Sequence, residues 1–219
     1  ALCGKHDPRN RNFSGDLETI PAITQADLFA VKDRVIGRNN VIIAAVGDIT
    51  PDELRRRVAP ILARLPDVTP PDDLAPPVFA RFEAPVAIDF DQTQTIVYAV
   101  APAFPRTDPD NYAARVVSHI LGAGGLSSRL SERVRNQLGL VYGINSSYSG
   151  RADYGSVSFN FATANEAADD ALDATLEVWR DFAENGPTAE EVEEAIAYLT
   201  GSYANYFLNS NDVVDYVLS

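Results

Sequence analysis

The sequence contains very little cysteine and comparatively little positive charge. Cys3 is the only cysteine among 219 residues, which excludes an intrachain disulfide and a metal centre held by several thiolates. The 18 Lys and Arg residues are outnumbered by 31 Asp and Glu residues, so the formal net charge is -13. A surface this acidic repels phosphate, and we therefore expect neither nucleic acid nor anionic membrane surfaces as partners. No apolar run approaches the roughly 18 residues that a membrane span needs, so we expect no membrane span.

Histidine is scarce as well, and neither copy belongs to a catalytic motif. A helical zinc site of a protease needs two imidazoles four residues apart with a glutamate beside one of them. His6 begins HDPRN and His119 begins HILGA, so this chain should hold no zinc of its own. We interpret His119 as a structural residue of an apolar helix and His6 as a solvated loop residue. The glycines at 122–125 follow a helix and lack a G-K-[ST] continuation, which indicates a helix end rather than a phosphate loop.

The first third of the chain predicts a helix, a strand and a helix. Thr24 is a suitable N-cap for a helix over 24–35, and Thr50 followed by Pro51 is a strong start for one over 50–65. Between them VIIAAV at 41–46 has the composition of a buried strand. The next nineteen residues, 67–85, carry five prolines, which favours an extended linker between two domains. A long surface loop is the alternative.

The remainder of the chain predicts an antiparallel sheet with long helices. Strands are expected at 94–104, 140–150 and 154–164, and helices at 109–121, 127–138, 164–186 and from 188 onward. In the last strand Val157, Phe159 and Phe161 alternate with polar residues, which is typical of a sheet covered on one face. We therefore predict an α+β fold, a two-layer sandwich whose mostly antiparallel sheet has helices packed on one face.

Three arginines are concentrated at 124–143, in a chain that is otherwise acidic. SSRLSERVRNQL predicts an amphipathic helix that Ser127 or Ser128 caps, with Leu130, Val134 and Leu138 along one face. Gly139 then stands where a left-handed C-cap residue belongs, and a strand carrying Tyr142 should begin at Leu140.

This turn should bring the Arg135 guanidinium and the Tyr142 hydroxyl to the same region. Both groups donate hydrogen bonds, and the arginine stays charged at any relevant pH. Such a pair suits a carbonyl oxygen that gains negative charge, or a peptide main chain lying across it. The alternative is purely structural, with Arg135 stabilising the helix C-terminus and Tyr142 packing in the sheet.

The segment GGLSSRLSERVRNQLGLVYG closely resembles the signature of the second domain of M16 metallopeptidases, the group of insulinase, pitrilysin and mitochondrial processing peptidase. Val141 replaces the usual alanine. Residues 23–54 resemble the end of the first M16 domain, and residues 101–122 resemble the start of the second. The resemblance implies an M16 metallohydrolase-like fold divided into three parts. These are the C-terminal part of the first domain at 1–66, an interdomain linker at 67–85, and a second domain, truncated at its C-terminus, at 86–219.

The resemblance also implies a function. This chain would be the substrate-binding, non-catalytic half of a zinc metalloendopeptidase, in which Arg135 and Tyr142 hold a peptide substrate near the scissile bond. Zinc and its H-x-x-E-H helix would belong to another M16 domain, upstream in the same polypeptide or in a partner subunit, so the chain alone should be inactive. The alternative is a catalytically inactive M16-like subunit that supports an assembly. Bacterial origin is implied, with periplasm and cytoplasm both left open.

The ends of the chain lie in loop-like sequence and in an apolar segment, which predicts a fragment of a longer protein. In such a fragment the apolar run 41–46 needs a partner, and the incomplete sheet of the second domain has an edge to offer. We expect residues 41–46 to pair with the sheet at 95–161, within one chain or exchanged between two copies of a homo-oligomer.

Overall fold

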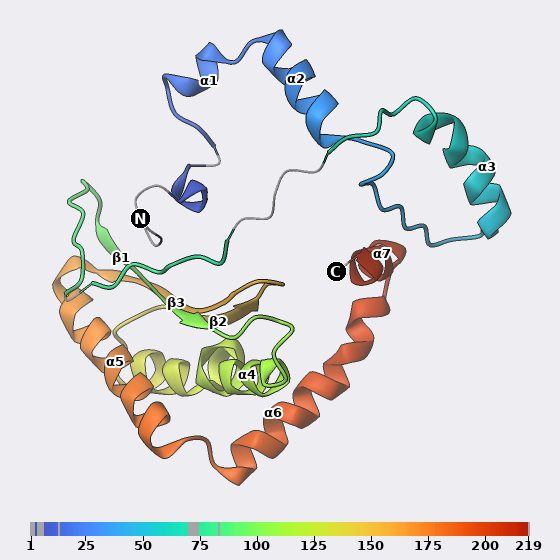
Figure 1. Cartoon of the computed structure of the whole chain (residues 1–219). Helices are drawn as coiled ribbons and strands as arrows, with labels where there is room; N and C mark the ends of the chain where they lie inside the picture. Colours follow the sequence, from blue (N-terminus) through green and yellow to red (C-terminus); the bar gives the residue numbers. More distant parts are fainter. Residues whose placement is uncertain (1–2, 4–6, 13, 70–74, 83, 219) are drawn as a thin grey trace. The chain divides into compact units, whose positions relative to one another are not determined.

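The computed structural model describes residues 3, 7–12, 14–69, 75–82 and 84–218. The chain forms two compact units (Figure 1). Unit 1 consists of residues 1–10 and 76–201, and unit 2 of residues 11–75 and 202–219. One division between them falls between Ala75 and Pro76, inside the proline-rich segment.

Unit 1 is built on a three-stranded antiparallel sheet in the order β1-β3-β2 (Figure 1). The strands are β1 (Gln94–Ala103), β2 (Ile144–Gly150) and β3 (Gly155–Ala164). Phe161 of β3 faces Val97 of β1 on one side and Ile144 of β2 on the other. The predicted antiparallel pairing of the second and third strands is therefore confirmed.

Helices cover one face of this sheet (Figure 1). The longest are α4 (Asn111–Ser118), α5 (Ala168–Asn185) and α6 (Ala189–Gly201). Phe159 and Phe161 point toward them and are buried with Leu130, Val134 and Phe182. This arrangement confirms the predicted α+β fold with helices on one face, because the alternation along β3 gives the sheet a single apolar side.

The opposite face of the sheet is polar on β2 and β3, whereas the edge strand β1 exposes Ile96 and Tyr98. Asn145 on β2 and Asn160 on β3 are exposed there, in register with Tyr98 on β1. Part of this face is approached by the N-terminal segment, which includes the short helix η1 (Pro8–Asn10), and an isolated bridge joins Cys3 to Phe79.

Two predicted α-helical stretches are wound as π-helices. They are η2 (His119–Ala123), which continues α4, and η4 (Ser131–Gln137), which follows the turn η3 (Gly125–Ser127). A π-turn contains more residues than an α-turn, so a four-residue spacing that is kept through a π-helix moves progressively away from one face. Leu130 and Val134 are fully buried, whereas Leu138 is 41% exposed, and the prediction that all three line one face is wrong for Leu138.

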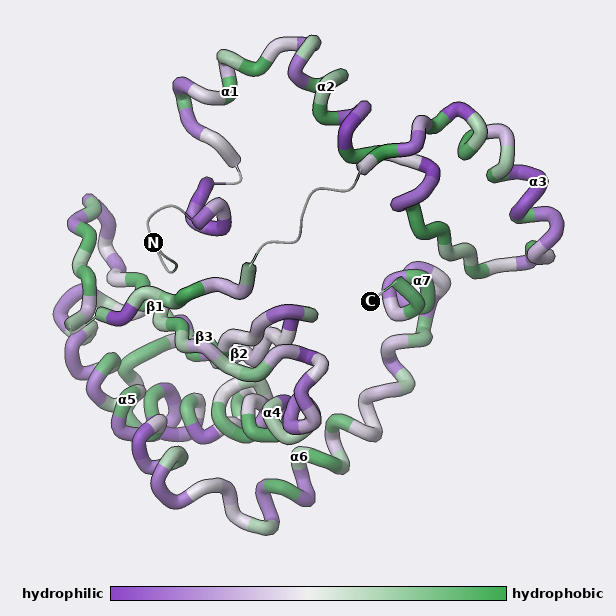
Figure 2. The backbone as a smooth tube through the Cα atoms, viewed as in Figure 1, coloured by the Kyte–Doolittle hydropathy of each residue, from purple (hydrophilic) through white to green (hydrophobic). Residues whose placement is uncertain are grey.

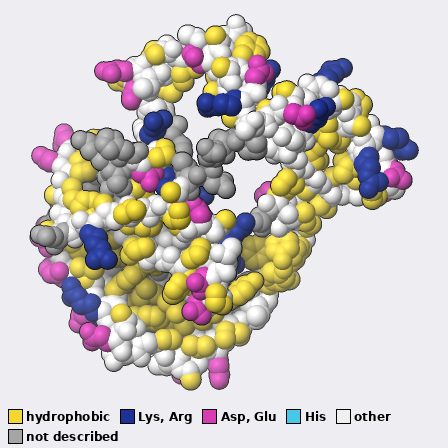
Figure 3. Space-filling model, viewed as in Figure 1, with side chains coloured by type: hydrophobic (Ala, Val, Ile, Leu, Met, Phe, Trp, Pro, Cys, Tyr) yellow, Lys and Arg dark blue, Asp and Glu magenta, His cyan; other side chains and the backbone are white. Residues whose placement is uncertain are grey.

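Unit 2 contains short helices with largely exposed apolar side chains. Its elements are α1 (Thr19–Ala22), α2 (Gln25–Val35), α3 (Pro51–Leu62), η6 (Ser202–Phe207) and α7 (Ser210–Leu218). Thr24 and Thr50 cap α2 and α3 as predicted. The predicted inward face of α2, formed by Leu28, Val31 and Val35, is exposed, and hydrophobic side chains are visible on the surface (Figure 3). Within the described ranges no helix is both long and apolar enough to cross a membrane.

Residues 41–46 are not a strand. They run as an irregular, strongly hydrophobic segment between α2 and α3 (Figure 2), and Ile42 is 82% exposed. The sheet of unit 1 has three strands in the described part of the chain, and this segment is not one of them. The predicted strand, and its pairing with the sheet of the same chain, are therefore wrong. High β-propensity alone does not form a strand when no hydrogen-bonding neighbour is available.

Candidate functional site

The turn between η4 and β2 is held in place from three sides. Gly139 has φ 64°, the left-handed conformation predicted for it. The backbone N–H of Leu140 donates to the Val134 carbonyl at 3.0 Å, and the Thr163 hydroxyl donates to the Leu140 carbonyl at 2.5 Å. Val141 is buried in the core. The backbone that carries Tyr142 is thus anchored in unit 1.

Arg135 and Tyr142 meet at this turn. The Nε of Arg135 donates to the backbone carbonyl of Tyr142 at 2.7 Å, and its Cζ lies 5.8 Å from the centre of the Tyr142 ring. The predicted approach of the two side chains is therefore present. The predicted strand position of Tyr142 is wrong, because β2 begins two residues later, at Ile144.

The Tyr142 side chain is 92% exposed although its backbone is anchored. It does not pack in the sheet, so the structural alternative is wrong for this residue. The Nε of Arg135 donates to the Tyr142 carbonyl, and its Nη1 donates to the side-chain oxygen of Asn136. Its Nη2 has no hydrogen-bond partner within the described residues. The charged guanidinium thus lies beside the Tyr142 ring, and both side chains carry groups that can donate to an incoming carbonyl oxygen. Arg135 also lies on a π-helix, a winding that is frequent at functional sites.

Arg129 has a different, structural environment that the sequence does not reveal. Its Nε and Nη2 donate to the two carboxylate oxygens of Glu191 at 2.6 and 2.7 Å, and Nη2 also donates to the Gly186 carbonyl at 3.0 Å. Asp181 lies 3.3 Å from Nη1, and the guanidinium stacks over the Phe182 ring at 4.9 Å. Arg129 therefore joins the start of the helical segment at 129–137 to the junction of α5 and α6.

The hydrogen bonds from Arg129 lower the pKa of the Glu191 carboxyl from 4.5 to about 2. A lowered pKa means that this pair stabilises the fold at pH values above 4.5 and that the contribution is lost as the pH falls from 4.5 toward about 2. We expect Glu191→Gln to unfold at lower urea concentration than the wild type, by a constant margin between pH 5 and 8. Below pH 4.5 the margin should shrink, and a margin unchanged at pH 3 would contradict the assignment.

The glycines at 122–125 form a helix end and turn, as predicted. The Gly124 N–H donates to the His119 carbonyl at 2.8 Å, and Gly125 has φ 70°. His119 is half-buried and stacks on Tyr198 with ring centres 4.8 Å apart, and burial lowers the pKa of its imidazole. These features agree with the structural role predicted for His119. His6 lies outside the described residues.

The described residues contain no group of three or more His, Cys, Asp or Glu side chains that could hold a metal ion. His119, the histidine that the structure describes, faces a small cavity together with Tyr198 and Glu194. Zinc therefore does not fit any donor set among the residues that the structure describes.

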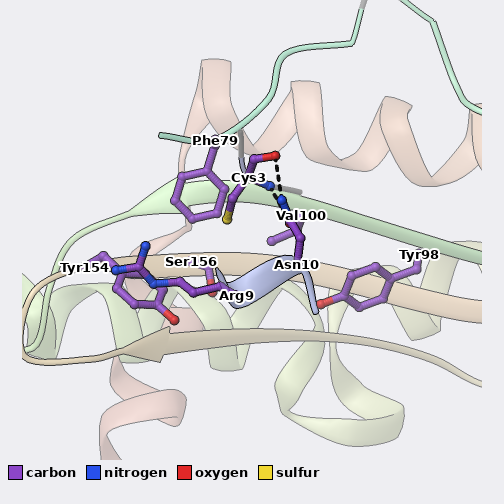
Figure 4. A pocket seen from close by; sticks show the side chains of 8 residues that line it. All are labelled: Cys3, Arg9, Asn10, Phe79, Tyr98, Val100, Tyr154 and Ser156. Atoms are coloured by element: carbon purple, nitrogen blue, oxygen red, sulfur yellow. Dashed lines mark hydrogen bonds between the residues drawn. The ribbon is translucent and has the colours of Figure 1, made fainter. Parts of the chain in front are cut away.

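A pocket of about 350 Å³ lies on the sheet face opposite the helices (Figure 4). Tyr98 and Val100 of β1 and Ser156 of β3 form its floor, and Phe79 and Tyr154 stand at its sides. This pocket was not predicted from the sequence. The outward position of Tyr98 on an alternating strand was the one available signal, but the N-terminal residues that complete the pocket are far away in sequence.

Residues 22–199 match the family described as Peptidase M16 inactive domain. A crystal structure of a peptidase M16 inactive domain from Pseudomonas fluorescens is similar, with a TM-score of 0.84 and 31% identity over 98% of this chain and 51% of that one.

Two curated relatives differ in how they are named. An uncharacterised zinc protease of Streptomyces coelicolor is 27% identical over 88% of this chain and 43% of its own length. A protein of Helicobacter pylori named as a non-peptidase homolog is 29% identical over 86% of this chain and 43% of its own length. The chain spans less than half the length of these relatives. Because the family match covers most of its residues, the chain belongs to the peptidase M16 inactive domain family.

Proposed function

We propose that this chain is the substrate-binding, non-catalytic half of an M16-type zinc metalloendopeptidase, in which Arg135 and Tyr142 clamp a peptide backbone near the scissile bond. The observation that carries the proposal is the exposure of Tyr142, which is 92% although the backbone around it is anchored. An exposed aromatic residue on a fixed turn contributes little to the core, and its exposure leaves the Tyr142 hydroxyl accessible for donation to another molecule.

The clamp would act through hydrogen bonds to one carbonyl group of the substrate. Arg135 is already oriented by its bond to the Tyr142 carbonyl, so its Nη2 group needs little rearrangement to meet a peptide oxygen. The Tyr142 hydroxyl would donate from the neighbouring side. Donors that are positioned before the reaction stabilise negative charge developing on that oxygen without a reorganisation cost.

The zinc ion and its H-x-x-E-H helix would be supplied by an M16 domain that precedes this one or that belongs to a partner subunit. Relatives named as zinc proteases support this assignment. In the same proposal residues 1–66 are the end of that first domain, 67–85 the linker and 86–219 the second domain. The exposed apolar face of α2 and the hydrophobic run at 41–46 support it, since both need a partner that the described residues do not provide.

A second function is favoured by the relative named as a non-peptidase homolog. In this alternative the chain belongs to a catalytically inactive M16-like subunit that supports an assembly. The H-x-x-E-H motif distinguishes the two: an intact motif in the first domain favours the protease, and a degenerate one favours the assembly subunit.

The experiment compares the complete protein with residues 1–219 alone. We expect the complete protein to hydrolyse an unstructured, quenched fluorescent peptide, and residues 1–219 to show no hydrolysis. After dialysis against a weak chelator, elemental analysis of residues 1–219 should find no stoichiometric zinc, because the histidine motif is missing. One tightly held zinc per chain, or a complete protein with an intact motif and no hydrolysis, would contradict the proposal.

A further inference from the structure

Thr163 is a buried polar residue near the C-terminal end of β3. Its side chain lies on the helix-covered face of the sheet, in the same row as Phe159 and Phe161, and is 3% exposed. Valine would fill the same space with comparable β-propensity and without a hydroxyl group that needs a hydrogen bond. Packing alone therefore does not account for the hydroxyl, whereas its bond to the Leu140 carbonyl at 2.5 Å does.

This bond holds the chain at the point where it enters β2. Ile144 faces Phe161 across β2 and β3. Two more residues of the same antiparallel pairing would place Tyr142 opposite Thr163. β2 instead begins at Ile144, whereas β3 continues past Phe161 and is paired with β1 on its other side. The Thr163 side chain thus takes over where the backbone pairing with β2 stops, and it bonds to the chain two residues before Tyr142.

Leu140 is fixed through both of its backbone polar groups. Its N–H donates to the Val134 carbonyl of η4 at 3.0 Å, and its carbonyl accepts from the Thr163 hydroxyl of β3. The next residue, Val141, is buried in the core. These restraints fix the backbone from which the Tyr142 side chain projects with 92% exposure. The Thr163 hydroxyl is the restraint that a buried polar side chain supplies.

We propose that Thr163 is a positioning residue, whose hydroxyl holds the Leu140 carbonyl and thereby sets the place from which Tyr142 donates to the substrate carbonyl. The inference rests on the proposed function and adds to it a residue that does not touch the substrate. Displacing a catalytic group by about 1 Å can cost about 10²-fold in rate. Loss of this one bond should therefore reduce catalysis although every group that contacts the substrate is kept.

The test compares three variants of the complete protein. Thr163→Val keeps the buried volume and removes the hydroxyl, whereas Thr163→Ser keeps the hydroxyl and removes the methyl group. Thr175→Val is the matched control. Thr175 is fully buried on α5, and its hydroxyl donates to the Ala171 carbonyl of its own helix at 2.7 Å. The control thus loses the same kind of hydrogen bond at a position outside the proposed site.

We expect Thr163→Val to lower kcat on a quenched fluorescent peptide by about tenfold and to leave KM within about twofold. The loss falls on kcat because the Tyr142 hydroxyl acts on the transition state, and it is partial because Val141 remains buried. Thr163→Ser and Thr175→Val should keep kcat within about threefold of wild type. Urea unfolding gives the stability of each variant. A merely structural residue would make kcat follow stability, whereas a positioning residue makes it follow the hydroxyl.

The Tyr142→Phe background tests whether Thr163 acts through the Tyr142 hydroxyl. Once that hydroxyl is absent its position no longer matters, so Thr163→Val should cause less than about a twofold further loss. A further loss as large as the one in the wild-type background would show that Thr163 acts elsewhere, and it would overturn the proposal.

Hydrogen exchange of the complete protein gives a result that does not depend on activity. Loss of the bond should speed exchange of the amides at 139–143 by about tenfold in Thr163→Val, and leave it unchanged in Thr163→Ser and Thr175→Val. If peptides are cleaved and Thr163→Val has the kcat of wild type, the positioning role is wrong and the proposed function stands. If no peptide is cleaved, faster exchange keeps Thr163 as the residue that holds the turn and rejects the protease. Unchanged exchange in that case rejects both.

Discussion

Replacing Tyr142 by phenylalanine should lower kcat/KM of the complete protein on a peptide substrate by about 10²-fold or more. This is the range observed when one preorganised donor to a developing oxyanion is removed. The substitution removes the hydroxyl and keeps the ring. Steady-state hydrolysis of a quenched fluorescent peptide measures the effect.

The fold should be unaffected by this substitution. Arg135 donates to the backbone carbonyl of residue 142, which phenylalanine retains, and the side chain is almost fully exposed. Tyr112→Phe is a suitable control, because Tyr112 is 76% exposed on α4 and lies outside the proposed site. Activity of the Tyr142→Phe protein within a factor of two of wild type would show that the clamp proposal is wrong.

Replacing Arg129 by alanine should destabilise the complete protein by about 2–3 kcal/mol. The substitution removes both hydrogen bonds to Glu191, the bond to the Gly186 carbonyl and the contact with the Phe182 ring. Breaking a buried ion pair costs about 3–5 kcal/mol, and the partial exposure of this pair reduces the expected value. Urea unfolding, with the midpoint and slope compared between variants, measures the change.

Arg133→Ala provides the contrast. Arg133 lies on the same helical segment but is 42% exposed, and its ion pair with Glu177 is long, at 3.7 Å. Its removal should change the unfolding free energy by no more than about 0.5 kcal/mol. Equal effects of the two substitutions would mean that Arg129 is not the residue that ties the segment to α5 and α6.

Features of the site that depend on neighbouring residues could be predicted from the sequence. The helix starts at Thr24, Thr50 and Thr188 and the left-handed Gly139 were correctly expected, since a cap or a C-terminal glycine acts within three or four residues. The approach of Arg135 to Tyr142 was predictable for the same reason, because a single turn separates them.

The environment of Arg129 and the composition of the pocket could not be predicted, because both depend on contacts between residues that are far apart in the sequence. Arg129 and Arg135 are chemically identical in the sequence, and only the fold brings Glu191, 62 positions away, to the first of them. The pocket likewise combines Cys3 and Phe79 with strands that begin after residue 90.

The sequence by itself determined the helix and strand periodicities of unit 1, the single apolar face of its sheet and the family signature around Arg135. Tertiary structure alone decided the π-winding of η4, the outward direction of Tyr142 and the irregular path of residues 41–46. The physical reason is the range of the interactions. Periodicity and capping depend on neighbours within one or two turns, whereas burial and strand pairing depend on whichever distant segment supplies the other surface.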